Sequence, residues 1–188
     1  CLLSSIFFDA LKKISQSALT EIVVSQERCI DLCWTKSKLC NVCQENCGVD
    51  AIKIDSGVEI DWSKCVKCGV CAAVCPTEVF EIQSPSNRTI LNSIVEASEN
   101  EHIIVECNFV NGRYRGEEKH PKSKSGKKIT VSCIGRFSEI FQLHSIIIGE
   151  GKIEFVKCTS DCRFTEGLSA TEDMRRRTER FLEIFRTD

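Results

Sequence analysis

The chain has 188 residues and is 42% hydrophobic, which is enough to bury one large core or two small ones without a membrane. Its 25 Lys and Arg nearly balance 27 Asp and Glu, so net charge gives no attraction to nucleic acid or to an anionic bilayer. Apolar runs such as 146–148 are far shorter than the roughly 20 residues that cross a bilayer. We therefore expect two compact units in a soluble, cytoplasmic chain, with no nucleic acid partner and no membrane span.

The first two segments of the chain differ in their residue pattern. Residues 1–20 place Leu3, Phe7 and Ile14 on one helical stripe, which predicts an N-terminal amphipathic helix. Residues 21–84 are rich in cysteine and end at a stretch of Ser, Pro and Asn. Such a stretch is typical of a domain boundary.

Residues 85–188 alternate between strand-like and helix-like patterns. We expect helices at 89–97 and 139–148 and strands at 102–106, 129–132 and 153–157. Ser169 and Glu172 have the spacing of a capping box at the start of a last helix. This alternation is typical of a small α/β unit with a mostly parallel sheet.

Fourteen cysteines in 188 residues indicate disulfides, structural zinc or iron–sulfur clusters. The spacing of Cys65, Cys68, Cys71 and Cys75, followed by Pro76, is C-x2-C-x2-C-x3-C-P. This is the spacing of bacterial [4Fe-4S] proteins, in which three cysteines bind one cluster and the fourth reaches another. Zinc ribbons instead use paired C-x2-C motifs, so the spacing favours iron–sulfur clusters over zinc.

An internal repeat supplies a second motif. Cys40, Cys43 and Cys47 align with Cys68, Cys71 and Cys75 at a constant offset of 28 residues. The remaining ligand of the first motif is Cys29 or Cys33. The distance from the preceding strand-like segment favours Cys29, which then stands where Cys65 does in the second motif and leaves an eight-residue insertion in the first loop.

Residues 21–84 resemble the bacterial two-[4Fe-4S] ferredoxins over about 60 residues, with Gly48 where that family has Pro. The resemblance implies an α+β ferredoxin-like domain and two cubane clusters. By that resemblance, cluster I takes Cys29, Cys40, Cys43 and Cys75, and cluster II takes Cys65, Cys68, Cys71 and Cys47.

Four further cysteines follow the predicted strands of residues 85–188. Cys107, Cys133 and Cys158 each come at a strand end, and Cys162 lies four residues after Cys158. The carboxyl ends of parallel strands meet at one edge of a sheet, so we expect these thiols to converge there. Their convergence favours a metal or cluster site, while zinc, a redox-active dithiol and buried structural cysteines remain the alternatives.

The segments Cys107-Asn-Phe, Val131-Ser-Cys133-Ile-Gly-Arg136 and Cys158-x3-Cys162-Arg-Phe resemble the delta subunit of methyl-viologen-reducing hydrogenase, a domain that also occurs with heterodisulfide reductase complexes. The resemblance spans about 85 residues. It implies a [2Fe-2S] cluster at the four cysteines. It also implies partners that are larger redox subunits: a dehydrogenase or hydrogenase on one side and a flavin and iron–sulfur reductase on the other.

The sequence contains no P-loop, no Gly-rich nucleotide loop and no catalytic triad pattern. We therefore expect an electron-transfer subunit without a catalytic centre of its own. Segment 111–128 holds seven Lys or Arg against two Glu, which makes it a candidate surface for docking an acidic partner.

Overall fold

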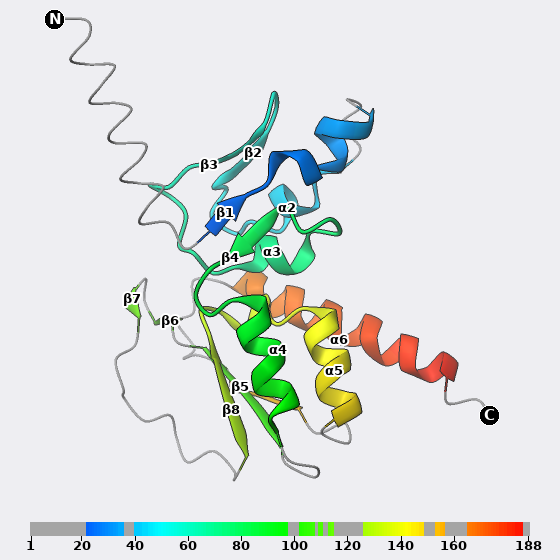
Figure 1. The fold of residues 1–188 in the computed structure, drawn as a ribbon. Helices are drawn as coiled ribbons and strands as arrows, with labels where there is room; N and C mark the ends of the chain where they lie inside the picture. The colour runs from blue at the N-terminus through cyan, green and yellow to red at the C-terminus, as the bar shows by residue number, and fades with distance from the viewer. Residues whose placement is uncertain are drawn as a thin grey trace, which may run out of the picture.

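The computed structural model describes residues 22–35, 40–97, 102–107, 109–110, 113–114, 126–148, 153–156 and 165–185 (Figure 1). The helix predicted for residues 1–20 lies outside the described residues. Segment 111–128 also lies mostly outside them, except for two residues of a short hairpin and its last three positions. Within the described residues, no helix is long and apolar enough to cross a bilayer.

The cysteine-rich half consists of two small antiparallel sheets and short helices. One sheet pairs β1 (Ile22–Val24) with β4 (Phe80–Ile82), and the other pairs β2 (Ile52–Ile54) with β3 (Val58–Ile60). Each sheet therefore joins one strand from each copy of the repeat. The helical elements are η1 (Gln26–Arg28), the π-helical turn η2 (Asp31–Thr35), α2 (Val42–Glu45) and α3 (Val70–Val74).

The repeat seen in the sequence is also a repeat in the strand pairing. Ile22 pairs with Ile82 in one sheet, and Val58 pairs with Ile54 at the equivalent place in the other. Helix α3 likewise follows α2 by the same 28 residues that separate the cysteine motifs. Because one strand of each copy crosses to the other copy's sheet, neither copy can form its core alone.

The strands of this half are short, and their alternating side chains supply its core. Ile22, Ile52, Val58 and Phe80 are buried and pack in one cluster, together with the partly buried sulfur atoms of several cysteines. These cysteines are thus part of the hydrophobic core and not an addition at its surface.

The second half has the parallel sheet that the sequence predicts. Its strand order is β8-β5-β9, and both pairings are parallel. The strands are β5 (Ile103–Cys107), β8 (Lys127–Val131) and β9 (Ile153–Val156), and a small hairpin joins β6 (Phe109–Val110) to β7 (Arg113–Tyr114). The helical elements are α4 (Asn87–Val95), η3 (Ile134–Arg136), α5 (Glu139–Ile148) and α6 (Thr165–Phe185).

The core of the second half lies between the sheet and its helices. Ile103 and Val105 of β5 are fully buried against Ile94 of α4 and Phe137, which follows η3. Ser86 caps α4, since its hydroxyl oxygen accepts a hydrogen bond from the Thr89 N–H at 3.1 Å. This cap starts α4 two residues before the predicted helix at 89–97.

One sequence prediction for this half is wrong. The last helix begins at Thr165, so Ser169 is an interior residue of α6 and not its N-cap. Its early turns pack on η3 and α3, and this tertiary packing outweighs the local capping signal. Strand β7 and the first two residues of β8 lie in the basic segment 111–128.

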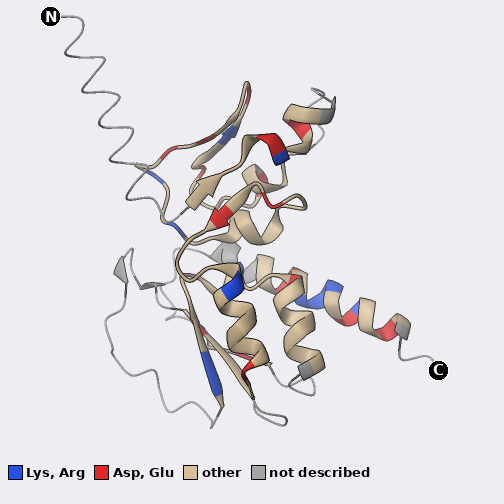
Figure 2. Cartoon of the chain, in the orientation of Figure 1, with Lys and Arg blue, Asp and Glu red and all other residues tan. Residues whose placement is uncertain are grey.

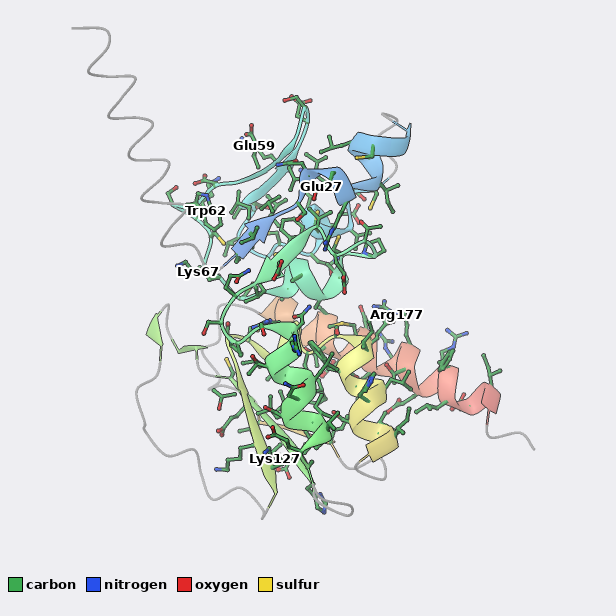
Figure 3. All side chains as sticks on the ribbon, viewed as in Figure 1. Glu27, Glu59, Trp62, Lys67, Lys127 and Arg177 are labelled. Atoms are coloured by element: carbon green, nitrogen blue, oxygen red, sulfur yellow. The ribbon has the colours of Figure 1, made fainter. Side chains whose placement is uncertain are left out.

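The two halves meet where α6 and η3 pack against α3. Val70 of α3 is buried with Ala170 and Met174 of α6. Figure 1 shows the first part of α6 running past α3. Farther along α6, Arg177 lies beside α5 (Figure 3), and its Nε donates to a carboxylate oxygen of Glu139. The outer face of α6 carries both signs of charge (Figure 2). Helix α6 therefore joins the cysteine-rich half to the helical layer of the second half.

Candidate metal centre

The first group of thiols lies around one pocket of the cysteine-rich half. Cys29, Cys40, Cys43 and Cys75 line the same pocket, whose other walls are mainly apolar and include Pro76. Burial, and then the charges of Cys75, Cys40 and Cys29, raise the pKa of the Cys43 thiol to about 12. The structure therefore brings together the four residues expected at cluster I.

The second group contains the four residues expected at cluster II. Burial raises the pKa of the Cys68 thiol to about 11, and the charges of Cys65 and Cys47 add to that increase. Burial also raises the pKa of Cys71 well above its usual value, with further contributions from Cys68, Cys65, Cys43 and Cys47. Since Cys43 belongs to the first group, Cys71 and Cys43 mark where the two groups adjoin.

One cysteine of each motif lies with the other motif's group, and the local backbone explains this exchange. The N–H of Ala51 donates to Cys47 Sγ at 3.3 Å, and the N–H of Val79 donates to Cys75 Sγ at 3.4 Å. Each contact lies in a turn that leads directly into a strand, β2 or β4. The turns therefore hold Cys47 and Cys75 at equivalent positions in the repeat. Hydrogen bonds to cluster sulfur atoms also tune reduction potentials.

The same turns share an unusual backbone conformation. Asp50 has φ 49° and Glu78 has φ 55°, so a left-handed residue stands three positions after Cys47 and after Cys75. Gly69, between Cys68 and Cys71, has φ 83°. A glycine adopts this conformation without the steric cost that a side chain would add. It lets the chain turn sharply between two thiols of the second group.

These donor sets fit [4Fe-4S] clusters chemically. Thiolates bind iron, and the raised pKa values of Cys43 and Cys68 mean that the metal-free thiols are protonated at neutral pH. Cluster binding would therefore release protons and return charge to the buried sulfur atoms. No three His, Cys, Asp or Glu side chains of the described residues lie close enough to share a single metal ion. A cubane spreads its four thiolates over four iron atoms, so its ligands need not meet at one point.

Cys29 and Cys33 have different surroundings. Cys29 is 5% exposed and lines the pocket of the first group. Cys33 is exposed, and its Sγ donates to the Glu27 carbonyl oxygen at 3.1 Å. Only Cys29 of these two therefore lies with the other thiols of the first group.

Asp31 is a residue of this site that sequence reasoning missed. It lies in the insertion of the first motif, is 7% exposed, and its Oδ1 accepts a hydrogen bond from the Cys40 N–H at 3.3 Å. This contact ties the insertion to the start of the thiol motif. A single acidic residue in a cysteine-rich loop gives no sequence signal for such a role, because the partner is a backbone group nine residues away.

The strand-end cysteines form a smaller cluster in the second half. Cys107 ends β5, and Cys133 follows β8 by two residues. Both are nearly fully buried, at 2% and 3% exposure, and Cys107 Sγ donates to the Ser132 carbonyl oxygen at 3.2 Å. A hydrogen bond with Cys107, and then burial, raise the pKa of Cys133. Cys158 and Cys162 lie outside the described residues.

A comparison with protein families is decisive for part of the cysteine-rich half. The family described as the 4Fe-4S binding domain matches residues 58–81, which include Cys65, Cys68, Cys71 and Cys75. The chain contains a 4Fe-4S binding domain. This domain indicates a [4Fe-4S] cluster and supports an iron–sulfur electron-transfer role. Comparison of the chain with curated proteins and with solved structures finds no match.

The burial difference between Cys29 and Cys33 gives a testable prediction. We expect Cys29→Ser to remove or convert one [4Fe-4S] cluster, because Cys29 lies in the pocket of the first group. Cys33→Ser is the matched control and should leave both clusters intact, since its sulfur is exposed. Iron and sulfide analysis with EPR of anaerobically purified protein measures both variants. Loss of a cluster in Cys33→Ser alone would transfer the ligand role to Cys33.

Proposed function

We propose that this chain is an electron-transfer subunit with two [4Fe-4S] clusters and a third redox site at the strand ends. In this role it relays electrons between a dehydrogenase or hydrogenase and a larger flavin and iron–sulfur reductase. Cluster I would be held by Cys29, Cys40, Cys43 and Cys75, and cluster II by Cys47, Cys65, Cys68 and Cys71. When bound, the clusters supply one-electron chemistry, and the chain supplies their burial, spacing and hydrogen bonds.

The observation that carries this proposal is the proximity of the two groups of four thiols. The charge of Cys43, in the first group, contributes to the raised pKa of Cys71 in the second group. Two clusters so close together favour electron transfer between them over reaction at either one. The lining of the first pocket is mainly apolar, and burial of this kind is one of the factors that set the reduction potential of an iron–sulfur cluster.

The packing of the two halves supports a particular order along the relay. Cys133 is close enough to Cys68 for the charge of Cys68 to raise its pKa. Element η3, which follows Cys133 directly, also packs on α3, which begins two residues after Cys68. Cluster II would therefore be the neighbour of the strand-end cysteines, and cluster I would be at the far end of the relay.

The third site of this relay would be a [2Fe-2S] cluster at Cys107, Cys133, Cys158 and Cys162. The support for it is the juxtaposition of Cys107 and Cys133 together with the parallel pairing of β9, after which Cys158 follows by two residues. Parallel strands end at a common edge, which is where binding sites of such sheets usually lie.

A second candidate function has one observation in its favour. Cys107 and Cys133 are hydrogen-bonded to each other, an arrangement that also suits a dithiol that cycles with a disulfide. The strand-end cysteines would then form a redox-sensing or zinc-binding module attached to a ferredoxin domain, and they would hold no iron.

Metal content separates these candidates. We expect about ten iron atoms per chain in anaerobically purified protein, four from each cubane and two from the third site. EPR should then detect a [2Fe-2S] signal besides those of the cubanes. About eight iron atoms without that signal would remove the third cluster, and about one zinc per chain would favour the second candidate function.

The relay also predicts a stable association with larger redox subunits. We expect native anaerobic purification to recover the chain with a dehydrogenase, hydrogenase or reductase subunit. Neutralising the basic segment at Lys119, Lys122, Lys124, Lys127 and Lys128 should slow this association and weaken its salt dependence, while cluster content stays unchanged. Elution of an active monomer without any redox subunit would instead indicate a free ferredoxin-like carrier.

A further inference from the structure

Arg136 is the largest side chain among the most deeply buried residues of the described chain, with 1% of its surface exposed. It ends η3 in the second half, three residues after Cys133. A guanidinium group keeps its positive charge at any physiological pH. Burial of such a charge is unfavourable unless negative charge lies nearby.

The side chain of Arg136 lies directly on the loop of the second thiol group. A Cβ atom built on Gly69 would lie 2.8 Å from Arg136 Cδ and 3.0 Å from its Cγ. Gly69 stands between Cys68 and Cys71 and has φ 83°. The glycine therefore serves two purposes, since it permits the sharp turn and leaves room for the stem of the arginine.

Two hydrogen bonds fix the end of the Arg136 side chain. Its Nη2 donates to the Pro85 carbonyl oxygen and to Asn87 Oδ1, the latter at 3.3 Å. Both acceptors are uncharged, and these bonds orient the guanidinium. They also anchor it at the junction between the two halves, beside the first turn of α4.

We infer that Arg136, which belongs to the second half of the chain, raises the reduction potential of cluster II through its positive charge. The inference rests on the proposed function, since it needs cluster II to be bound. A cluster held by four thiolates becomes more negative when it gains an electron. A buried positive charge beside its loop favours that reduced form and raises the potential, whereas cluster I would be bound by the other group of thiols and should be affected less.

The size of the effect can be bounded by Coulomb's law. At an effective dielectric constant of about 20, a unit charge changes the equilibrium constant for one-electron reduction of a group about 12 Å away by about tenfold. Arg136 Cδ contacts the Gly69 loop of the second group, and the guanidinium carbon is two bonds beyond Cδ. A tenfold change corresponds to about 59 mV for a one-electron couple.

Anaerobic redox titrations of the full chain, followed by EPR, test the inference. We expect Arg136→Met, which keeps the apolar stem and removes the charge, to lower the potential of cluster II by about 59 mV, or tenfold in the equilibrium constant. The potential of cluster I should change much less. A Cys43→Ala background, which removes cluster I, identifies the remaining signal as that of cluster II.

Three further variants separate charge from structure. Asn87→Asp puts a carboxylate beside the guanidinium at a helix start that tolerates acidic residues, and it should lower the same potential by a smaller amount. Arg136→Lys keeps the charge, so the equilibrium constant for reduction of cluster II should change by no more than about twofold. Lys64→Met removes a charge next to Cys65 whose side chain is 53% exposed, and solvent screening should leave the potential nearly unchanged.

The outcomes distinguish this inference from the proposed function. The iron count and EPR signals of the unmodified chain report on the clusters themselves. The role of Arg136 would be overturned if the unmodified, Arg136→Met and Asn87→Asp chains all keep two cubanes and share the same cluster II potential. That result would leave the proposed function intact. If Arg136→Met does not fold, Asn87→Asp alone decides, since it leaves the arginine in place.

Discussion

The structure of the cysteine-rich half depends on the burial of thiols that must lose their protons to bind iron. Its strands have only three residues each, so the sulfur atoms of the cysteines contribute to a core that apolar side chains alone would leave small. The same burial raises the pKa of Cys43 and Cys68. A bound [4Fe-4S] cluster would compensate for the negative charge of the buried thiolates, and we therefore expect the stability of this half to depend on cluster binding.

The crossing of the repeat follows from this constraint. Each sheet takes one strand from each copy, and the turn before β2 or β4 carries a cysteine toward the other copy's thiols. Among the described residues, η3 and α6 of the second half pack against α3, the helix of the second group. In the relay that we propose, this packing makes cluster II the neighbour of the strand-end cysteines.

The sequence was informative where spacing is fixed by local geometry. The offset of 28 residues predicted the equivalence of Cys47 and Cys75, and the β-like runs predicted a parallel sheet, which β5, β8 and β9 form. The start of α6 was misjudged, because packing on η3 outweighs a capping signal at Ser169. The contact between Arg136 and Gly69 had no sequence signal either, since it joins residues 67 positions apart that meet only when both halves are folded.

The central claim is that the thiols form two crossed groups, and the iron content of paired variants tests it most directly. Cys43 and Cys75 belong to one group in this account, so Cys43→Ala with Cys75→Ala should retain one cubane, with about four iron atoms from [4Fe-4S] clusters per chain. Cys71→Ala with Cys75→Ala removes one thiol from each group and should retain neither cubane. The reverse result, with one cubane kept when Cys71 and Cys75 are both replaced and none when Cys43 and Cys75 are, would contradict the crossing.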